Sequence, residues 1–138
     1  MLRQRLIHPD ILGALAGAGH GSKILICDGN YPASTVLGQN ASLVYLNLAP
    51  GKPTVTEVLD ILLTAIKVEE ACVMDPDTGR EPQVFQEFRS LLPDVALTTY
   101  SRFEFYEEAA GSDTCLQIVT GDQRLYASLL VTVGVMAP

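Results

Sequence analysis

Short apolar runs alternate along most of the chain with longer segments whose apolar residues recur at helical spacing. The run KILIC at residues 23–27 is short, apolar and bounded by turn residues, as is typical of a strand buried on both faces. Residues 54–66 instead begin with Thr54 as a helix cap and Glu57 three positions later, followed by apolar side chains three or four positions apart, which predicts an amphipathic helix. The same criteria predict the other elements in chain order: a helix at 9–16, strands at 43–48 and 71–74, a helix at 82–91, a strand at 95–99, a helix at 101–110, and strands at 114–120 and 126–133.

This alternation of strands and helices predicts an α/β fold with a central, largely parallel sheet. The last two strands, 114–120 and 126–133, are joined by a short turn and are expected to form an antiparallel hairpin, which makes the sheet mixed. The chain has 138 residues and contains no repeat, linker or low-complexity stretch. We therefore expect a single domain over residues 1–138.

The composition restricts the partners of the protein. There are 9 Lys and Arg against 16 Asp and Glu, and the net charge of −7 disfavours binding to nucleic acid or to an anionic membrane surface. Charged residues make up only 18% of the chain, below the roughly 25% of ordinary globular domains, which favours a homo-oligomer that covers part of the surface. No apolar run reaches the length of a membrane span, and a cytoplasmic location is expected.

Asp28 and His20 flank the KILIC strand and are the first candidates for chemistry. Asp28 follows the strand directly, and ligands of open α/β sheets bind beyond the carboxyl ends of the strands; a turn with Asn30 is the structural alternative. His20 lies between Gly19 and Gly21, where its ring is not crowded. An imidazole there can exchange protons near neutral pH, although a histidine that merely ends a helix is the alternative.

Two later segments add further polar groups. The segment SRFEFYE places Arg102 at a strand-to-helix junction, where its guanidinium can bind paired hydroxyls or can pair with neighbouring glutamates. The segment TGDQRLYAS carries Tyr126 and Ser128 near the start of the last predicted strand, which adds a phenol and a hydroxyl.

Several common site patterns are absent from the sequence. The glycines of GAGHG close a helix and precede a strand, which reverses the context of a dinucleotide-binding loop. His8 and His20 show no ExxH or HxxxH spacing, and the cysteines form no CxxC pair. No serine lies in a GxSxG elbow. Neither a dinucleotide cofactor nor a metal site is therefore expected.

Four segments in order carry a resemblance to a known family. HPDIL, GHGSKILICDGNYPAS, SRFEFYE and TGDQRLYAS together resemble the D-ribose pyranase and L-fucose mutarotase family, from about residue 6 to residue 136. The resemblance implies a three-layer α/β/α fold and assembly into rings, often decamers, with sites at subunit contacts. It also implies interconversion of anomers or ring forms of a free monosaccharide without cofactor or metal. The family's proton-donating histidine corresponds to His20, its sugar-binding aspartate to Asp28, and the tyrosine of its closing motif to Tyr126.

The resemblance also distinguishes two branches of that family. The ribose branch typically has histidine at the position of Arg102, whereas the fucose branch has arginine followed by F-x-F-Y, as this chain does. Ser128 departs from the family's usual asparagine, and the lost amide predicts one sugar contact that is missing or bridged by water. The expected activity is that of an L-fucose mutarotase-like isomerase, in which Asp28, Arg102, Tyr126 and Ser128 bind the sugar and His20 and Tyr126 handle protons. A D-ribose pyranase and a non-catalytic monosaccharide-binding or transport accessory protein are the alternatives.

Overall fold

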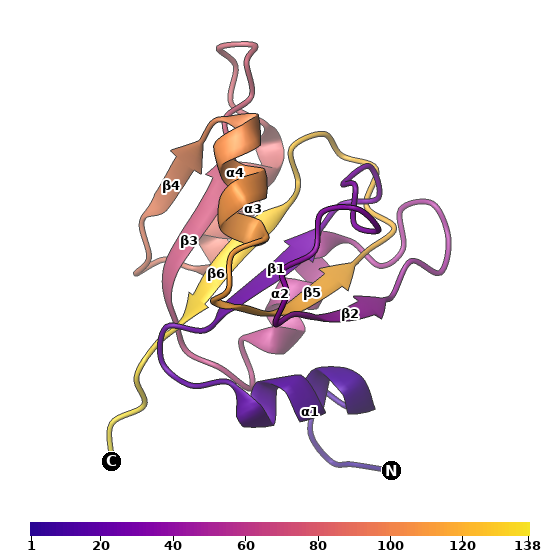
Figure 1. Ribbon diagram of the computed structural model, residues 1–138, viewed down its shortest axis with the longest axis vertical. Helices are drawn as coiled ribbons and strands as arrows, with labels where there is room; N and C mark the ends of the chain where they lie inside the picture. Colours follow the sequence, from indigo (N-terminus) through magenta and orange to yellow (C-terminus); the bar gives the residue numbers. More distant parts are fainter.

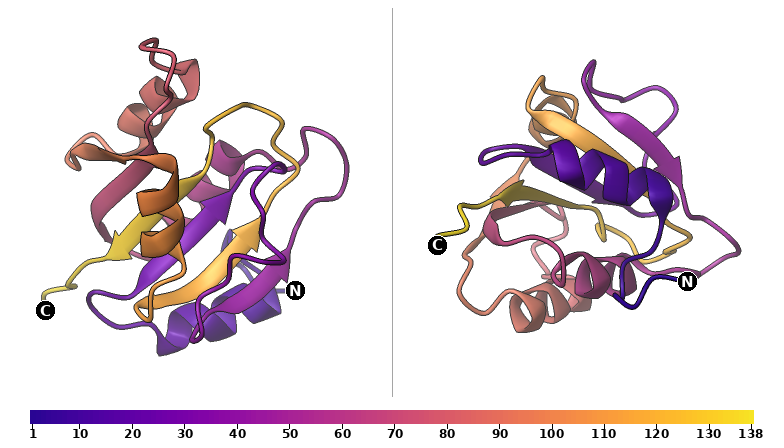
Figure 2. Two further views of the ribbon diagram at one scale, coloured as in Figure 1. Left: turned by 45° about the horizontal axis from the view of Figure 1, so that its top comes forward. Right: turned by 90° about the horizontal axis from the view of Figure 1, so that it is seen from below.

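Helices cover both faces of one six-stranded mixed sheet, as Figure 1 and Figure 2 show. The structure is a computed structural model and describes residues 1–138. In chain order the elements are α1 (Pro9–Gly17), β1 (Lys23–Cys27), β2 (Ser42–Tyr45), α2 (Val55–Leu62), β3 (Val68–Met74), α3 (Gln83–Leu91), β4 (Leu97–Tyr100), α4 (Arg102–Ala109), β5 (Thr114–Val119) and β6 (Leu129–Val133). None of the helices is long and apolar enough to span a membrane. The predicted α/β class is confirmed.

The order of the strands corrects one prediction. The sheet runs β2-β5-β1-β6-β3-β4, with β1 and β2 parallel to β5, β3 parallel to β4, and β6 antiparallel to both of its neighbours. The predicted hairpin of the last two strands is therefore wrong, because β1 lies between β5 and β6. β1 is the KILIC strand, and its buried Leu25 and Ile26 face opposite sides of the sheet, which suits a central position. The segment 120–128 passes the end of β1 instead of making a tight turn, and β6 begins at Leu129 rather than at residue 126.

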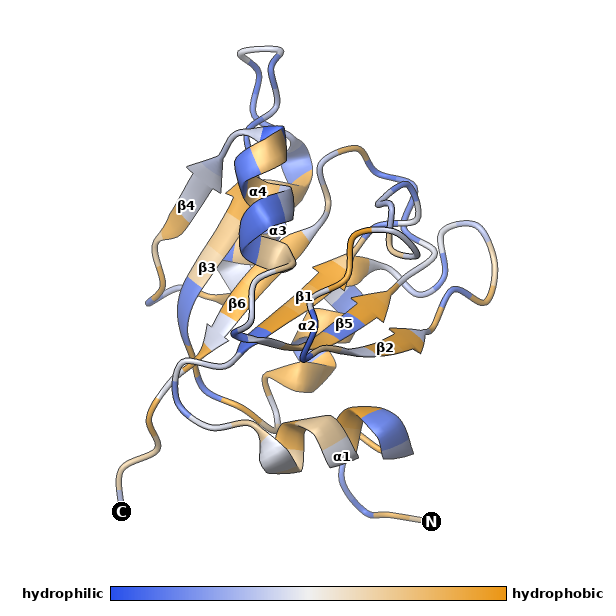
Figure 3. Ribbon diagram, in the orientation of Figure 1, coloured by the Kyte–Doolittle hydropathy of each residue, from blue (hydrophilic) through white to orange (hydrophobic).

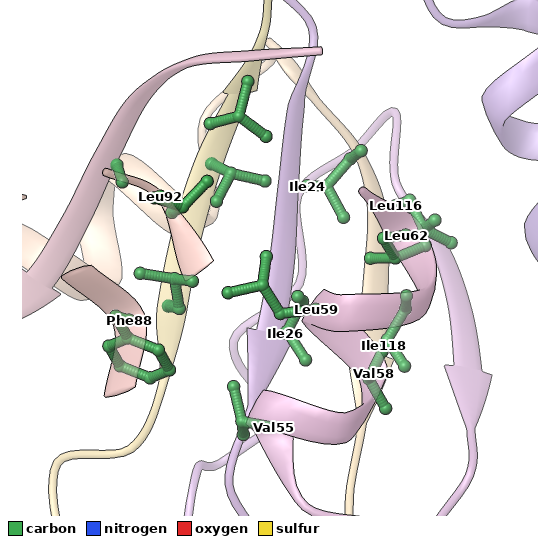
Figure 4. Close-up of a cluster of buried hydrophobic side chains, with 14 of the residues drawn as sticks. Ile24, Ile26, Val55, Val58, Leu59, Leu62, Phe88, Leu92, Leu116 and Ile118 are labelled. Carbon is green, nitrogen blue, oxygen red and sulfur yellow. The ribbon is translucent and has the colours of Figure 1, made fainter. Parts of the chain in front are cut away.

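Two hydrophobic clusters hold the helices against the sheet. The larger cluster joins α1, α2 and α3 to one face, and Figure 4 shows Leu59 and Phe88 among the aliphatic side chains of the strands. The smaller cluster lies on the other face beneath α4 and includes Phe105 and Tyr31. Figure 3 shows that the central strands are hydrophobic whereas the helices are mixed in character. Each large apolar side chain buried in this way contributes roughly 1.5–3 kcal/mol, so the two clusters stabilise the three layers.

Helix α2 begins as its sequence predicts. The Glu57 amide donates to Thr54 Oγ1 at 3.2 Å, and the Thr54 amide donates to Glu57 Oε2 at 2.7 Å, which completes a capping box. The helix ends at Leu62, before the predicted residue 66. A turn follows in which the Thr64 hydroxyl donates to the Ile61 carbonyl at 2.7 Å.

The parallel strands give the sheet two chemically different edges. We call the edge where β1 to β5 end the carboxyl edge; the arrowhead of β1 marks it in Figure 1. The opposite edge, where these strands begin, is the amino edge. Because β6 is antiparallel, the segment that precedes it also lies at the carboxyl edge. His20 precedes β1 and therefore lies at the amino edge, whereas Asp28 follows β1 and lies at the carboxyl edge.

Candidate active site

A cavity of about 310 Å³ opens at the carboxyl edge of the sheet. Its lining comes from the loop after β1, the end of β3, helix α4 and the segment before β6: Asp28, Asn30, Tyr31, Met74, Arg102, Tyr106, Leu125, Tyr126 and Ser128. The structure thus brings together four of the five residues that the sequence singled out. A hollow of this size with a few convergent polar groups suits a small polar molecule.

Asp28 is buried in the wall of this cavity, with 7% of its surface exposed. Its Oδ1 accepts from the Asn30 amide at 2.9 Å, and its Oδ2 accepts from the Ser128 hydroxyl at 2.8 Å. Burial raises the pKa of Asp28, and the hydrogen bonds from Ser128 and Asn30 offset only part of that effect. The turn with Asn30 and the place in the cavity are therefore both real, and one carboxylate serves both.

Ser128 is almost fully buried, and its hydroxyl engages Asp28 twice. Besides donating to the carboxylate, the Ser128 oxygen accepts from the Asp28 amide at 3.1 Å. The Ser128 hydroxyl thus uses its single donor on the Asp28 carboxylate and helps to orient it. An asparagine at this position would have an additional amide group to offer to a ligand.

Arg102 is the first residue of α4 and is exposed at the cavity. It forms no ion pair in this structure; Glu104 instead caps its own helix by accepting from the Ser101 amide at 3.0 Å. Tyr106 lies one helical turn after Arg102 and lines the same cavity, packed edge-on against Tyr31 with ring centroids 5.4 Å apart. The guanidinium is therefore free to donate to a ligand beside an aromatic wall.

Tyr126 occupies an unusual backbone conformation. Its φ is 60°, the one positive φ at a residue other than glycine in the chain. Such a conformation costs about 1–2 kcal/mol for a non-glycine residue and persists only where the surrounding structure holds it. Strain of this kind concentrates at functional sites, which agrees with the position of Tyr126 in the cavity wall.

His20 does not lie in this cavity. It is at the amino edge, where its Nε2 is 2.8 Å from Glu69 Oε1 on β3, and 59% of its side chain is exposed. The five residues of β1 separate it from Asp28, and a strand of that length spans about 16 Å. His20 and Asp28 of one chain therefore cannot contact the same small ligand.

Comparison with known proteins identifies the family. Residues 1–136 match the model of the RbsD / FucU transport protein family. The chain belongs to this family. The resemblance carried by the four sequence segments is thereby confirmed.

Individual members of the RbsD/FucU family are similar over nearly their whole length. Human fucose mutarotase is 35% identical, with 96% of this chain and 91% of the relative covered. A D-ribose pyranase of Streptomyces coelicolor is 30% identical, with 98% of each chain covered. Among solved structures, Bacillus subtilis RbsD complexed with D-ribose superposes with a TM-score of 0.86 at 22% identity, over 99% of this chain and 100% of the other. The fucose mutarotase of Streptococcus pneumoniae in complex with L-fucose gives 0.84 at 23% identity, with 99% and 100% covered. These structures establish the shared fold.

Sequence reasoning missed part of the cavity lining. Asn30 and Tyr31 belong to the NYPAS stretch, and Tyr106 follows Arg102 at helical spacing, so a signal for these three was present. Met74 ends an apolar strand and carries no signal that separates it from the core. No group of three or more His, Cys, Asp or Glu side chains is placed to hold a metal ion.

Proposed function

We propose that this protein interconverts the anomers of a free monosaccharide, L-fucose or a closely related sugar, by general acid–base opening and closing of the ring. The observation that carries the proposal is the cavity at the carboxyl edge, where a carboxylate, a guanidinium and a phenol converge. Relatives named fucose mutarotase and D-ribose pyranase support the reaction class. Arg102, unpaired and exposed at the cavity, supports a fucose-like six-carbon sugar.

The reaction needs reversible proton transfer but no covalent intermediate. The proton of the anomeric hydroxyl leaves while the ring oxygen gains one, the open aldehyde turns about its first carbon–carbon bond, and the ring closes on the other face. His20 would act as the proton shuttle, with Tyr126 as its partner or as a hydroxyl ligand. Asp28 and Arg102 would bind the sugar hydroxyls and stabilise charge on oxygen. Cys27 is no rival nucleophile, because burial raises its pKa to about 12.

His20 would reach the sugar from a neighbouring subunit. Within one chain, His20 and the cavity lie at opposite ends of β1. A complete site therefore needs the amino edge of a second copy. Leu125, which lines the cavity, and Phe103, which follows Arg102, are 69% and 74% exposed, as residues covered by a neighbouring subunit would be. A closed ring, with ten subunits as the expected number, would repeat this contact around its axis.

Glu69 would orient His20 in that complete site. Its carboxylate lies 2.8 Å from Nε2, and a carboxylate on one ring nitrogen fixes the tautomer so that the other nitrogen faces the reacting oxygen. The exposed imidazole of a single chain would then become a positioned acid–base group on assembly.

Anomer exchange measured by saturation-difference NMR tests the activity directly. L-fucose, D-galactose and D-ribose are compared side by side at equal protein concentration. Faster exchange of L-fucose than of D-ribose supports the proposal, and the reverse order would make the protein a D-ribose pyranase. Binding without accelerated exchange of any sugar would favour the alternative of a non-catalytic accessory protein. The name of the family, RbsD / FucU transport protein, agrees with that alternative.

Mixed assemblies test the shared site. His20→Ala and Tyr126→Phe subunits are purified separately, unfolded together and reassembled. If each site takes its histidine and its tyrosine from different subunits, about a quarter of the sites in a random equal mixture contain both native residues. Activity well above that of either parent supports a shared site. An active monomer by light scattering would contradict it.

A further inference from the structure

Two residues, Asp122 and Arg124, make the hydrogen bonds that attach the segment carrying Tyr126 to the rest of the fold, while Tyr126 and Ala127 pack against the hydrophobic core. Between residues 122 and 127, the hydrogen bonds to other parts of the structure come from Asp122 and Arg124. Gln123 and Leu125, the other residues before Tyr126, are exposed. The strained backbone at Tyr126 is therefore held from its amino-terminal side by Asp122 and Arg124.

Asp122 connects this segment to two others. Only 1% of its surface is exposed. Its Oδ2 accepts from the Val55 amide at the start of α2 at 2.9 Å, and its backbone carbonyl accepts from the Gly29 amide at 2.8 Å. Gly29 follows Asp28, so the same residue ties the segment before β6 both to a helix N-terminus and to the loop after β1.

Arg124 completes the attachment. Its Nε donates to Asp122 Oδ1 at 3.0 Å and its Nη2 to Asp122 Oδ2 at 2.7 Å, a forked pair that a lysine cannot copy. Its Nη1 donates to Glu87 on α3 at 2.7 Å, and its Nη2 also lies 3.2 Å from Thr56 Oγ1. One guanidinium thus fixes the segment against α2 and α3 at once.

We propose that the Asp122–Arg124 pair is a positioning device that holds Tyr126 in its left-handed conformation in the wall of the cavity. Neither side chain lines the cavity, so both act through Tyr126 rather than on a ligand. The consequence for turnover rests on the proposed function; the consequence for the conformation of Tyr126 does not.

The conformational consequence is tested by selective labelling. Protein with ¹³C in the backbone of its 5 tyrosines is compared as wild type, Arg124→Gln and Glu87→Gln, with Tyr126 assigned through Tyr126→Phe. Arg124→Gln is expected to move or broaden the Tyr126 Cα resonance, which reports φ, and to leave the other tyrosines in place. Glu87→Gln replaces the charged partner of Arg124 on α3 with a neutral acceptor but leaves the Asp122–Arg124 pair and its bonds to α2 in place, so it should move the Tyr126 resonance less than Arg124→Gln does. An unchanged Tyr126 resonance in Arg124→Gln would overturn the proposal; Arg124→Lys replaces that variant if it does not fold.

The catalytic consequence is tested by a double-mutant cycle in the anomer-exchange assay. Arg124→Gln should lower kcat about tenfold or more in the wild-type background but less than about twofold in the Tyr126→Phe background, because a residue that acts through Tyr126 has little left to position. Equal factors in the two backgrounds would mean that Arg124 supports only the fold, and would overturn the proposal. A wild-type protein that exchanges no sugar would refute the proposed function instead, and the resonance of Tyr126 would still decide the positioning role.

Discussion

The two edges of the sheet differ in how firmly they hold their functional groups. At the carboxyl edge, Asp28 is buried and bonded to Ser128, and Tyr126 is held in a strained conformation beside a cavity. At the amino edge, His20 is largely exposed and has one partner, Glu69. Under the proposed function, the firmly bonded carboxyl edge would bind and orient the sugar, whereas the exposed amino edge would present a single proton-exchanging group.

Under the proposed function, this difference would divide binding and proton transfer between two subunits. A chain that kept both functions at one edge could work as a monomer, but here about 16 Å of strand separates them. If a neighbouring subunit brings the amino edge to the cavity, activity depends on assembly while sugar affinity depends mainly on the cavity. Variants at the two edges should therefore fail in different ways.

The largest effect is expected from His20→Ala at the amino edge. Loss of a positioned acid–base group lowers kcat by about 10²–10⁴, while the groups proposed to bind the sugar at the carboxyl edge stay in place. Anomer exchange gives kcat, and light scattering together with circular dichroism checks assembly and fold. His8→Ala is the matched control, because His8 caps α1 and does not line the cavity. Full activity in a correctly assembled His20→Ala protein would show that His20 is not the proton shuttle.

A smaller effect is expected from Arg102→His at the carboxyl edge. The guanidinium offers fixed, forked donors to neighbouring hydroxyls, and histidine loses the permanent charge and reaches less far. kcat/KM should fall roughly ten- to a hundredfold for L-fucose and less for D-ribose. An equal, small loss for both sugars would show that Arg102 does not choose the substrate.

Much of the fold was predictable because its signals are local. The KILIC strand is apolar on both faces, and the Thr54–Glu57 capping box marks the start of α2 within four residues of sequence. The pairing of β5 with β1 is not local, and the turn-like residues 121–124 suggested a hairpin instead. Those residues proved to be polar for another reason, since Asp122 and Arg124 bind α2 and α3.

The site was predictable where topology alone decides it. Asp28 follows the central strand β1, and Arg102 follows β4, the outermost strand, which runs parallel to β1. Both residues therefore had to lie at the carboxyl edge. The partnership of His20 with Glu69 was not predictable, because it joins β3 to the loop before β1 across 49 positions of sequence. A single sequence carries no local signal that two residues so far apart along the chain lie in contact.

Asp122 is buried and holds the carboxyl edge together through Arg124 and Val55. We therefore expect Asp122→Asn to lower the free energy of unfolding. Burial alone would raise the pKa of Asp122, but the hydrogen bonds from Arg124 and Val55 outweigh it and hold the pKa below its usual value. The unfolded chain therefore takes up the proton first as the pH falls, and this stabilisation is present at neutral pH and lost below about pH 4. Asp122→Asn should lower the free energy of unfolding by about 1.5–3 kcal/mol at pH 7. Denaturation at fixed protein concentration should show that the difference shrinks in acid.

Asp28→Asn is the matched control for that experiment. The pKa of Asp28 is raised by burial, so the folded chain holds its proton longer and the native protein loses stability as the pH rises above about 4. Asp28→Asn should remove this loss, and the two variants should therefore change the pH dependence in opposite directions. The same direction in both would contradict the assignment of opposite environments to the two buried aspartates.

The smallest effect is expected from Glu69→Gln at the amino edge. The glutamine keeps a hydrogen-bonding oxygen near His20 Nε2 but removes the charge that favours one tautomer. Because a single hydrogen bond between exposed side chains contributes little, kcat should fall only about two- to fivefold, with KM unchanged since Glu69 does not line the cavity. Glu70→Gln is the control, as Glu70 is its neighbour and accepts from the Thr132 hydroxyl rather than from His20. A fall in kcat as large as that of His20→Ala would show that the amino edge is held as firmly as the carboxyl edge once the subunits assemble, whereas a change in KM alone would move Glu69 from proton transfer to sugar binding.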